Sequence, residues 1–451
     1  MKSNYLIDNA TIVNENTILK GCVLIINGFI HDILPQNNLS ETYLRENNIT
    51  RIDANCKILI PGVIDDQVHF REPGLTYKGD IESESAAAVA GGVTSYMEMP
   101  NTVPNTISIE LLEEKYQLAK QKSRANFSFY LGATNNNIDE INNFDPSQNA
   151  GIKVFLGAST GNMMVNNSLA LEKIFSTPFL IAIHSEDEMI IQKNAAIFRE
   201  RYGENVPISS HPLIRSEESC YVSTQKAVNL AKKFNTRLHV LHISTARELD
   251  LLKSSLPLEE KKITSEVCVH HLWFNDSAYE TLGTKVKWNP AIKTENDRQA
   301  LFNAIIDGTI DIVATDHAPH TLEEKMQTYF KAPSGGPLVQ HSLLAMLEFY
   351  HNKKLSLEKI VDLMCHKPAV CFKVEKRGYI RKNYYADMVL IDMNIPTKVD
   401  KDSLLYKCKW SPFEGLTFNS KIDCAFVNGQ IAYDGNQVQH DIIGKRLTFN
   451  Y

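Results

Sequence analysis

The sequence lacks the features that would assign it to a membrane or nucleic-acid-binding class. No apolar run approaches the ~18 residues that span a bilayer, and the N-terminal stretch MKSNYLIDNATIVNENTIL has no long apolar core of the kind found in secretory signals. There is no basic block, and 53 Asp and Glu against 47 Lys and Arg give a net charge of −6. We therefore expect no membrane or nucleic-acid partner, and predict a cytoplasmic protein that acts on a small molecule.

Paired cysteines are missing too. The eight cysteines are scattered and none forms a C-x-x-C pair, which predicts free thiols in a reducing compartment. There is no internal repeat or low-complexity tract, and 43% apolar and 22% charged residues are typical of a globular protein. A chain of 451 residues has room for about three ordinary domains, or for one α/β barrel of ~250 or more residues with a smaller unit.

The two ends of the chain resemble each other in pattern. Residues 1–60 and 380–451 contain short segments rich in β-branched residues between Asn and Gly turns, including MVLIDMN, DCAFVNGQIAYDG and the closing RLTFNY. Both ends therefore read as strands flanking one long middle section. We expect residues 1–60 and 380–451 to form a single small composite β-sandwich domain.

The middle of the chain, residues 61–379, alternates short apolar runs with helix-like stretches. About eight such runs occur, among them FSFYLGA, FLIAIH and DIVATD, and the helix-like stretches include IESESAAAVAGG and SCYVSTQKAVNLAKKF. Strands that alternate with helices favour a parallel sheet. Eight units over about 320 residues fit a (β/α)₈ barrel with insertions, and a doubly wound open sheet is the alternative.

Polar residues repeatedly end the apolar runs of this middle section. Twelve of the fourteen histidines lie between residues 61 and 379, and the residues that end or closely follow five of the runs are His69, His184, His242, His270 with His271, and Asp316. In a parallel barrel the carboxyl ends of the strands meet on one face, where active sites form. One such histidine alone reads as an ordinary polar strand end. Five together predict a metal site, because His, Asp and Glu are ligands of zinc and related metals.

Lys153 stands out because the GIKVFLGA segment around it is apolar. A buried ammonium is costly, and desolvation lowers the pKa of a lysine toward neutrality. A neutral amine reacts with carbon dioxide to give an anionic carbamate, which is suited to bridge two cations. The simpler interpretation is a lysine that extends from the strand end to solvent.

Eight segments together carry a specific resemblance. They occur in order over residues 61–321: PGVIDDQVHFREPG, MEMPNT, GIKVFLGA, IAIHSED, LHVLHIST, VHHLWF, NPAIKTENDR and ATDHAPHT. With the terminal stretch YYADMVLID, they make the chain similar to the bacterial dihydroorotases of the amidohydrolase superfamily over nearly its whole length. The resemblance implies a distorted (β/α)₈ TIM barrel, and reversible cyclisation of N-carbamoyl-L-aspartate to L-dihydroorotate in pyrimidine biosynthesis.

The resemblance also implies roles for individual residues. His69 and Asp316 would bind a first metal, His184 and His242 a second, and Lys153 matches the carboxylated lysine that bridges them in some members. Asp316 would also be catalytic, as the group that carries a proton. The implied substrate-binding residues are Arg71, Asn101, Asn289, His320, and Ser334 and Gly335 of the loop Pro333–Gly336. The implied cofactor is zinc, one or two ions, although manganese or cobalt would suit the same ligands. Whether the chain forms a homodimer, as barrel enzymes of this superfamily often do, stays open.

One position departs from the family pattern. The usual His-x-His motif is Gln67-Val68-His69 in this chain, which weakens the first metal position. Assuming the regular alternation of a strand, Gln67 and His69 would share one side and Asp66 would face the other. Two further functions therefore stay open beside dihydroorotase. One is another cyclic amidohydrolase such as a hydantoinase or allantoinase, although Arg71 favours a substrate that carries a carboxylate. The other is a non-catalytic partner of aspartate transcarbamoylase.

The Gln67 departure generates a test on metal retention. An amide oxygen is a weaker zinc ligand than an imidazole nitrogen, so we expect the first metal to leave early in graded dialysis against a chelator. Gln67→His should hold that metal longer, with metal per chain as the measurement. Two equally tight metals in the wild type, or no change in the variant, would contradict this expectation.

Overall fold

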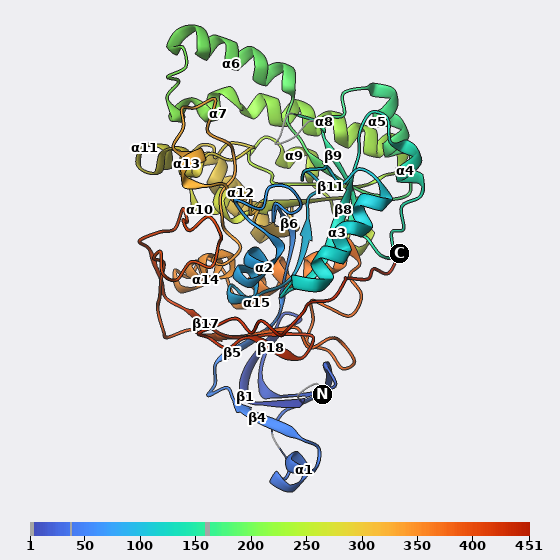
Figure 1. The fold of residues 1–451 in the computed structure, drawn as a ribbon, viewed down its shortest axis with the longest axis vertical. Helices are drawn as coiled ribbons and strands as arrows, with labels where there is room; N and C mark the ends of the chain where they lie inside the picture. Colours follow the sequence, from blue (N-terminus) through green and yellow to red (C-terminus); the bar gives the residue numbers. More distant parts are fainter. Residues whose placement is uncertain (1–3, 37, 158–162) are drawn as a thin grey trace.

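A computed structural model describes residues 4–36, 38–157 and 163–451. Ala158, the last residue of the GIKVFLGA motif, lies outside the described residues. The molecule has two parts in Figure 1, a ring of strands surrounded by helices above and a sheet that holds the N-terminal strands below. Among the described residues, no helix combines the length and apolar character needed to cross a bilayer.

Eight parallel strands form the predicted barrel. Each strand pairs with the next along the chain. In order they are β6 (Val63–Val68), β7 (Val93–Glu98), β8 (Asn126–Gly132), β9 (Gly151–Phe155), β10 (Leu180–His184), β11 (Arg237–Val240), β12 (Ile263–Cys268) and β13 (Ile312–Ala314). The ring closes irregularly. The backbones of β6 and the segment after β13 meet at a Val68–His317 bridge and a 2.7 Å bond from the His69 N–H to the His317 carbonyl, and the Thr315 hydroxyl donates to the Asp65 Oδ2 at 2.6 Å. The distorted (β/α)₈ fold is confirmed.

Helices follow the strands and cover the outside of the ring (Figure 1). The longer ones are α2 (Ile81–Ala90), α3 (Ile109–Lys122), α5 (Ser168–Phe175), α6 (Glu188–Tyr202), α8 (Glu217–Phe234), α12 (Glu295–Asp307) and α14 (Ser342–His351). The shorter ones are α4 (Ile138–Asn142), α7 (His211–Ile214), α9 (Leu249–Leu252), α10 (Val269–Trp273), α11 (Ala278–Leu282), α13 (Leu322–Lys325), α15 (Leu357–Val361) and α16 (Lys367–Phe372). Helix α1 (Glu41–Glu46) instead lies below the ring, beside the N-terminal strands (Figure 1). Capping boxes at Asp80 and Thr294 satisfy the first N–H groups of α2 and α12.

A second sheet joins strands from both ends of the chain. Its order is β18-β17-β14-β5-β1-β2-β3, with β4 beside β1. The strands are β1 (Asn4–Asn14), β2 (Thr17–Ile26), β3 (Phe29–Leu34), β4 (Ile49–Asp53), β5 (Ile58–Pro61), β14 (Met388–Asp392), β17 (Lys421–Val427) and β18 (Gln430–Tyr433), while β15 (Thr397–Lys398) and β16 (Thr417–Phe418) pair separately. The central contact is antiparallel, between β5 and β14, so the expected composite of the two termini is formed.

The prediction of a closing strand in RLTFNY is wrong. Among the described residues, this segment makes only isolated bridges, from Arg446 to Phe127 and from Phe449 to Val374. Its backbone runs against the start of β8, where the Phe127 N–H donates to the Lys445 carbonyl and the Leu447 N–H to the Phe127 carbonyl. The β-branched and aromatic residues of this segment suit its pairing with the barrel. Residue composition alone does not show whether a segment pairs with the barrel or with the small sheet.

Candidate functional site

A small polar pocket opens at the carboxyl ends of the barrel strands. It is lined by Gln67, His69, Arg71, Lys153, Phe155, His184, His242, Asn289, Asp316, Ala318, Ser334 and Gly335. All five expected metal ligands are in this set, with four of the six expected substrate-binding residues. Asn101 and His320 lie just behind it. The residues that the sequence analysis singled out from separate strands are therefore brought together.

Asp316 and His69 face each other on one side of the pocket. The His69 Nδ1 lies 2.8 Å from the Asn101 Oδ1, and its Nε2 lies 3.2 Å from the Asp316 Oδ1. Because the Asn101 oxygen accepts the Nδ1 proton, the Nε2 lone pair points at a carboxylate oxygen. The Gln67 side chain also reaches this atom, with its Nε2 3.3 Å from the Asp316 Oδ1. Burial raises the pKa of Asp316 to about 7, against the lowering effect of His184, Lys153 and Arg71.

His184 and His242 face each other on the other side. The His184 Nδ1 lies 3.0 Å from the His242 Nε2, and both rings are buried. The His184 Nε2 lies 3.0 Å from the Glu186 Oε2, and the Arg215 Nε lies 3.0 Å from each Glu186 oxygen. Burial acts to raise the pKa of Glu186, but the Arg215 charge and His184 hold it below its ordinary value. Beside the ionised Glu186, the His184 Nε2 keeps its proton, so the Nδ1 lone pair faces His242.

Lys153 extends from β9 into the same pocket and is only 1% exposed. Its Nζ lies 4.7 Å from the centre of the Phe155 ring. Burial lowers the pKa of Lys153 to about 7, although Glu266 and Asp316 act to raise it. Near neutral pH a substantial fraction of this amine is therefore uncharged, as the apolar flanks predicted.

The expected side for Asp66 is wrong. The pairing of β6 with β7 shifts between Asp65 and Val68, so this strand end departs from regular alternation. Gln67 faces the pocket, as expected, but Asp66 contacts strand β11, where its Oδ2 lies 3.3 Å from the His239 Nε2. The irregular pairing allows these two successive side chains to lie on the same side of the strand.

Arg71 lies fully buried at the edge of the pocket. Its Nε donates to the Pro319 carbonyl at 3.0 Å, and its Nη2 lies 3.0 Å from the His320 Nε2. Burial lowers the pKa of Arg71 to about 10, so the group is still protonated at neutral pH. Asn101 contacts His69, and His320 also contacts Lys78, at 3.0 Å. Of these three, Arg71 alone lines the pocket directly.

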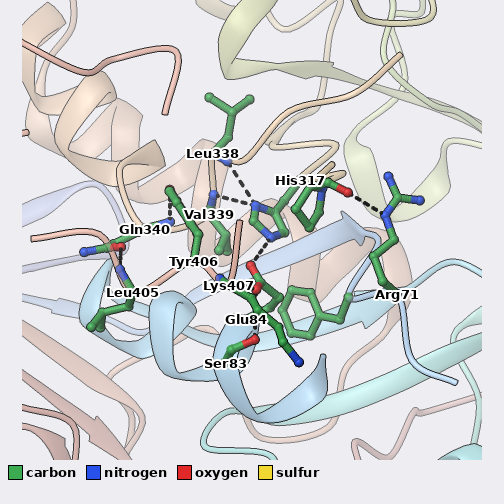
Figure 2. A network of polar contacts seen from close by, with 12 residues as sticks. Arg71, Ser83, Glu84, His317, Leu338, Val339, Gln340, Leu405, Tyr406 and Lys407 are labelled. Carbon is green, nitrogen blue, oxygen red and sulfur yellow. Dashed lines mark hydrogen bonds and ion pairs between the residues drawn. The ribbon is translucent and has the colours of Figure 1, made fainter. Parts of the chain in front are cut away.

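The segment that carries Asp316 is fixed by a buried network around His317 (Figure 2). The N–H groups of Leu338 and Val339 donate to the His317 Nδ1, at 3.0 and 3.3 Å. The His317 Nε2–H therefore donates to the Glu84 Oε2, at 2.8 Å, and the Lys407 N–H donates to the Glu84 Oε1 at 3.0 Å. Helix α2 and the C-terminal segment thus hold this side of the pocket in place.

Three pocket residues have a strained backbone. Arg71, His242 and Asp316 have φ angles of 71°, 40° and 46°, in the left-handed region that residues with a side chain seldom occupy. Other described residues outside the pocket share this region. In the pocket, the surrounding structure holds these conformations at three residues that the sequence analysis selected.

A buried lysine fixes the loop that closes the pocket. The fully buried Lys325 Nζ donates to the carbonyls of Lys287, Pro333 and Gly335, at 3.1, 2.9 and 2.7 Å. Gly335 has a φ of 122°, and a Cβ there would lie 2.6 Å from the Ala318 carbonyl oxygen, so the position requires glycine. Asn289, opposite, has a buried Oδ1 with no hydrogen-bond partner among the described residues. The pocket thus offers an unpaired acceptor beside a fixed loop.

The pocket residues fit a divalent cation. Burial lowers the pKa of His69, His184 and His242, so these imidazoles are neutral, as metal ligands must be. The lone pairs on the His69 Nε2 and the His184 Nδ1 face other ligand atoms at 3.2 and 3.0 Å. The residues that could hold a metal are His69, Asp316, His184 and His242, together with Lys153.

Sequence analysis missed several groups around the site. Glu186 with Arg215, and the pair Glu84 with His317, are buried polar pairs whose partners lie far apart in the chain. The only available signal for Glu186 was its place two residues after His184. Sequence analysis also missed two groups of three residues whose ligand atoms lie within 4.8 Å of one another. They are Cys268 with His270 and His271, and Asp66 with His239 and Glu266.

Comparison with known proteins identifies the family. Residues 58–432 match the family described as the amidohydrolase family. The chain is 30% identical to a dihydroorotase of Methanosphaera stadtmanae over 94% of this chain and 98% of that one, and 33% identical to a dihydroorotase of Halobacterium salinarum over 86% and 89%. The chain therefore belongs to the amidohydrolase family, and it is an enzyme, a cyclic amide hydrolase.

Similar solved structures carry other names. An L-hydantoinase (dihydropyrimidinase) from Arthrobacter aurescens superposes with a TM-score of 0.91 at 26% identity, covering 99% of this chain and all of that one. A dihydropyrimidinase from Brevibacillus agri has a TM-score of 0.88 at 22% identity, covering both chains fully, and supports the fold alone. Fold and sequence thus agree on the family and differ in the names of the similar proteins.

The buried Lys325 generates a prediction about the loop. Lys325→Met keeps the length of the side chain but leaves three buried carbonyls unpaired, so we expect a loss of about 2–3 kcal/mol in the free energy of unfolding. Hydrogen exchange in residues 326–336 should rise at the same time. The exposed Lys331 of the same loop provides the control, since Lys331→Met should change neither quantity. Unchanged exchange in Lys325→Met would show that this lysine does not order the loop.

Proposed function

We propose that the protein is a dihydroorotase, which interconverts N-carbamoyl-L-aspartate and L-dihydroorotate in pyrimidine biosynthesis in the cytoplasm. The observation that carries this proposal is the buried Arg71 guanidinium at the edge of a pocket lined by metal-type ligands. A fixed arginine fork is suited to bind a carboxylate in two places. Dihydroorotate carries a carboxylate on its ring, whereas hydantoin and allantoin do not.

The remaining substrate contacts follow from the pocket lining. Arg71 binds the carboxylate, positioned by His320 and the Pro319 carbonyl behind it. Asn289 contacts the ring through an amide whose Oδ1 is otherwise unpaired. Ser334 and Gly335 close over the ring from the fixed loop. Asn101 acts mainly on His69, because the Asn101 Oδ1 lies 2.8 Å from the His69 Nδ1. It therefore influences the substrate through His69.

Asp316 moves the proton. In the hydrolytic direction, its carboxylate accepts a proton from the attacking water and passes it to the ring nitrogen as the amide C–N bond breaks. In the direction of ring closure the same steps run in reverse. A pKa raised to about 7 by burial suits both tasks near neutral pH, because each protonation state of Asp316 is then accessible.

His69, Asp316, His184 and His242 would hold one or two zinc ions. When bound, zinc supplies a Lewis acid for the scissile carbonyl and lowers the pKa of a water. Lys153 would join them as a carbamate: its neutral amine forms a bond to the carbon of carbon dioxide, and the nitrogen releases a proton. Its partly neutral state near pH 7 supports this role. Gln67 would be a weak ligand, because its amide already lies beside Asp316.

A hydantoinase is the second candidate, favoured by the superposition on the L-hydantoinase from Arthrobacter aurescens. The same ligands and the same proton carrier would serve that reaction. Arg71 distinguishes the two candidate functions, because a neutral hydantoin ring offers no carboxylate to pair with its charge.

Lys153 provides the first test of this proposal. Lys153→Ala should lose most of the bound metal and nearly all activity, because the carbamate would be gone. A short carboxylic acid at high concentration should restore part of both, by supplying a carboxylate in the same space. Metal content by mass spectrometry of the metal, beside turnover, makes the measurement. Full activity and unchanged metal content in Lys153→Ala would contradict the carbamate role.

Substrate specificity provides the second test. The purified, zinc-supplied protein should convert dihydroorotate with a much higher kcat/KM than hydantoin or allantoin. Arg71→Lys keeps the charge but loses the fork, and should lower kcat/KM for dihydroorotate by about tenfold to a hundredfold, equivalent to ~1.4–2.8 kcal/mol. Its rate on hydantoin should change little. Preference for hydantoin in the wild type would favour the second candidate, and activity on none of the three would favour a non-catalytic partner.

A further inference from the structure

A second cluster of ligand-type side chains lies in the barrel interior, next to the pocket. Asp66 of β6, His239 of β11 and Glu266 of β12 are all fully buried. The His239 Nε2 lies 3.3 Å from the Asp66 Oδ2 and 3.4 Å from the Glu266 Oε2. None of these three residues belongs to the ligand set assigned to the pocket.

We propose that Asp66, His239 and Glu266 form a separate buried binding site for a divalent metal ion of the zinc type. This site is independent of the function proposed for the pocket. Its ligands are one imidazole nitrogen and two carboxylates, a set that zinc, manganese and iron all accept.

The surroundings of His239 suit a metal ligand. Its Nδ1 lies 2.8 Å from the Thr264 hydroxyl, and its Nε2 lies 3.4 Å from the Glu266 Oε2. With an ion bound, the Nε2 lone pair would face the ion, and the Nδ1–H would donate to the Thr264 oxygen, whose own proton has the Leu238 carbonyl as acceptor at 3.5 Å. A hydrogen bond from the second ring nitrogen is the arrangement usual for histidines that bind metal.

The spacing of the ligand atoms fits an ion of this kind. Two atoms that each lie ~2.0–2.1 Å from a tetrahedral ion are separated by roughly 3.3–3.4 Å. The two distances from the His239 Nε2 have these values. Neither carboxylate oxygen of Asp66 accepts a hydrogen bond from any of the described residues, although the side chain is fully buried. Unpaired buried carboxylates are costly, and an ion held between Asp66, His239 and Glu266 would pair this one.

A divalent cation would balance the charge of this cluster. Two carboxyl groups and one imidazole lie together in the barrel interior, and no lysine or arginine among the described residues forms a hydrogen bond or ion pair with them. The Phe372 ring lies 5.2 Å from the His239 ring, and the Tyr130 hydroxyl donates to the Asp66 carbonyl, so the site is enclosed by protein on these sides.

The cluster is separate from the pocket but close to it. The Cys268 Sγ lies 3.9 Å from the Glu266 Oε1 and 3.7 Å from the Gln67 Oε1. The same Glu266 oxygen accepts the backbone N–H of His242, at 3.1 Å. A metal that fixes Glu266 would therefore also fix the backbone that presents His242 to the pocket.

Anomalous diffraction tests the proposal on the unaltered full chain. Crystals of the zinc-loaded protein, measured on both sides of the zinc absorption edge, should show a peak between His239, Asp66 and Glu266, distinct from any peak in the pocket. The absence of a peak there, in crystals whose pocket is loaded, would overturn the proposal and assign the space to a shared proton.

Zinc per chain gives a second measurement in solution. After removal of metal and reloading, Asp66→Asn and His239→Gln should each bind about one ion less per chain than the wild type. Ser265→Ala is the matched control, because it removes a buried hydroxyl without a partner from the same strand, and should keep the wild-type count. A wild-type count in both ligand variants would also overturn the proposal. If either variant fails to fold, the diffraction experiment on the wild type still decides.

Discussion

The removal of water from ionisable groups at one end of the barrel is the constraint on which the rest of the site depends. Lys153, Asp316 and Arg71 are all buried there, and burial is the largest influence on the pKa of each. It brings the lysine and the aspartate toward neutrality and leaves the arginine charged. A single physical condition thus gives an amine that is partly uncharged, a carboxyl that can gain or lose a proton, and a permanent cation. These three states are what the proposed reaction requires.

Much of the fold and of the pocket could be predicted from the sequence, because both depend on local order along the chain. Apolar runs of a few residues that end in His or Asp identify strands and their carboxyl ends, and the parallel topology brings those ends together. The helix-like stretch IESESAAAVAGG forms α2 up to its two glycines, and SCYVSTQKAVNLAKKF forms all but the start of α8. The pocket therefore contains four predicted ligands from the ends of separate strands, namely His69, His184, His242 and Asp316.

What could not be predicted depends on contacts between distant segments. The irregular pairing after Asp65 changes the direction of Asp66, and regular alternation gives the opposite result. His239 reads as one polar residue inside a short strand, and only the closed barrel places it beside Asp66 and Glu266. The closing segment RLTFNY has strand-like composition, yet its partner is the beginning of β8. In each case the missing information is the identity of the neighbour.

The composite sheet has a consequence for how the chain is made. Strand β5 pairs with β14, whose residues lie more than 320 positions later in the chain. During synthesis, the β5 edge stays open until nearly the whole barrel has left the ribosome. At 5–20 residues per second, that delay is on the order of 16–65 s. An open apolar edge for that time invites pairing with other chains. The pairing of the N-terminal strands with β14 is therefore among the last contacts that can form as the chain is made.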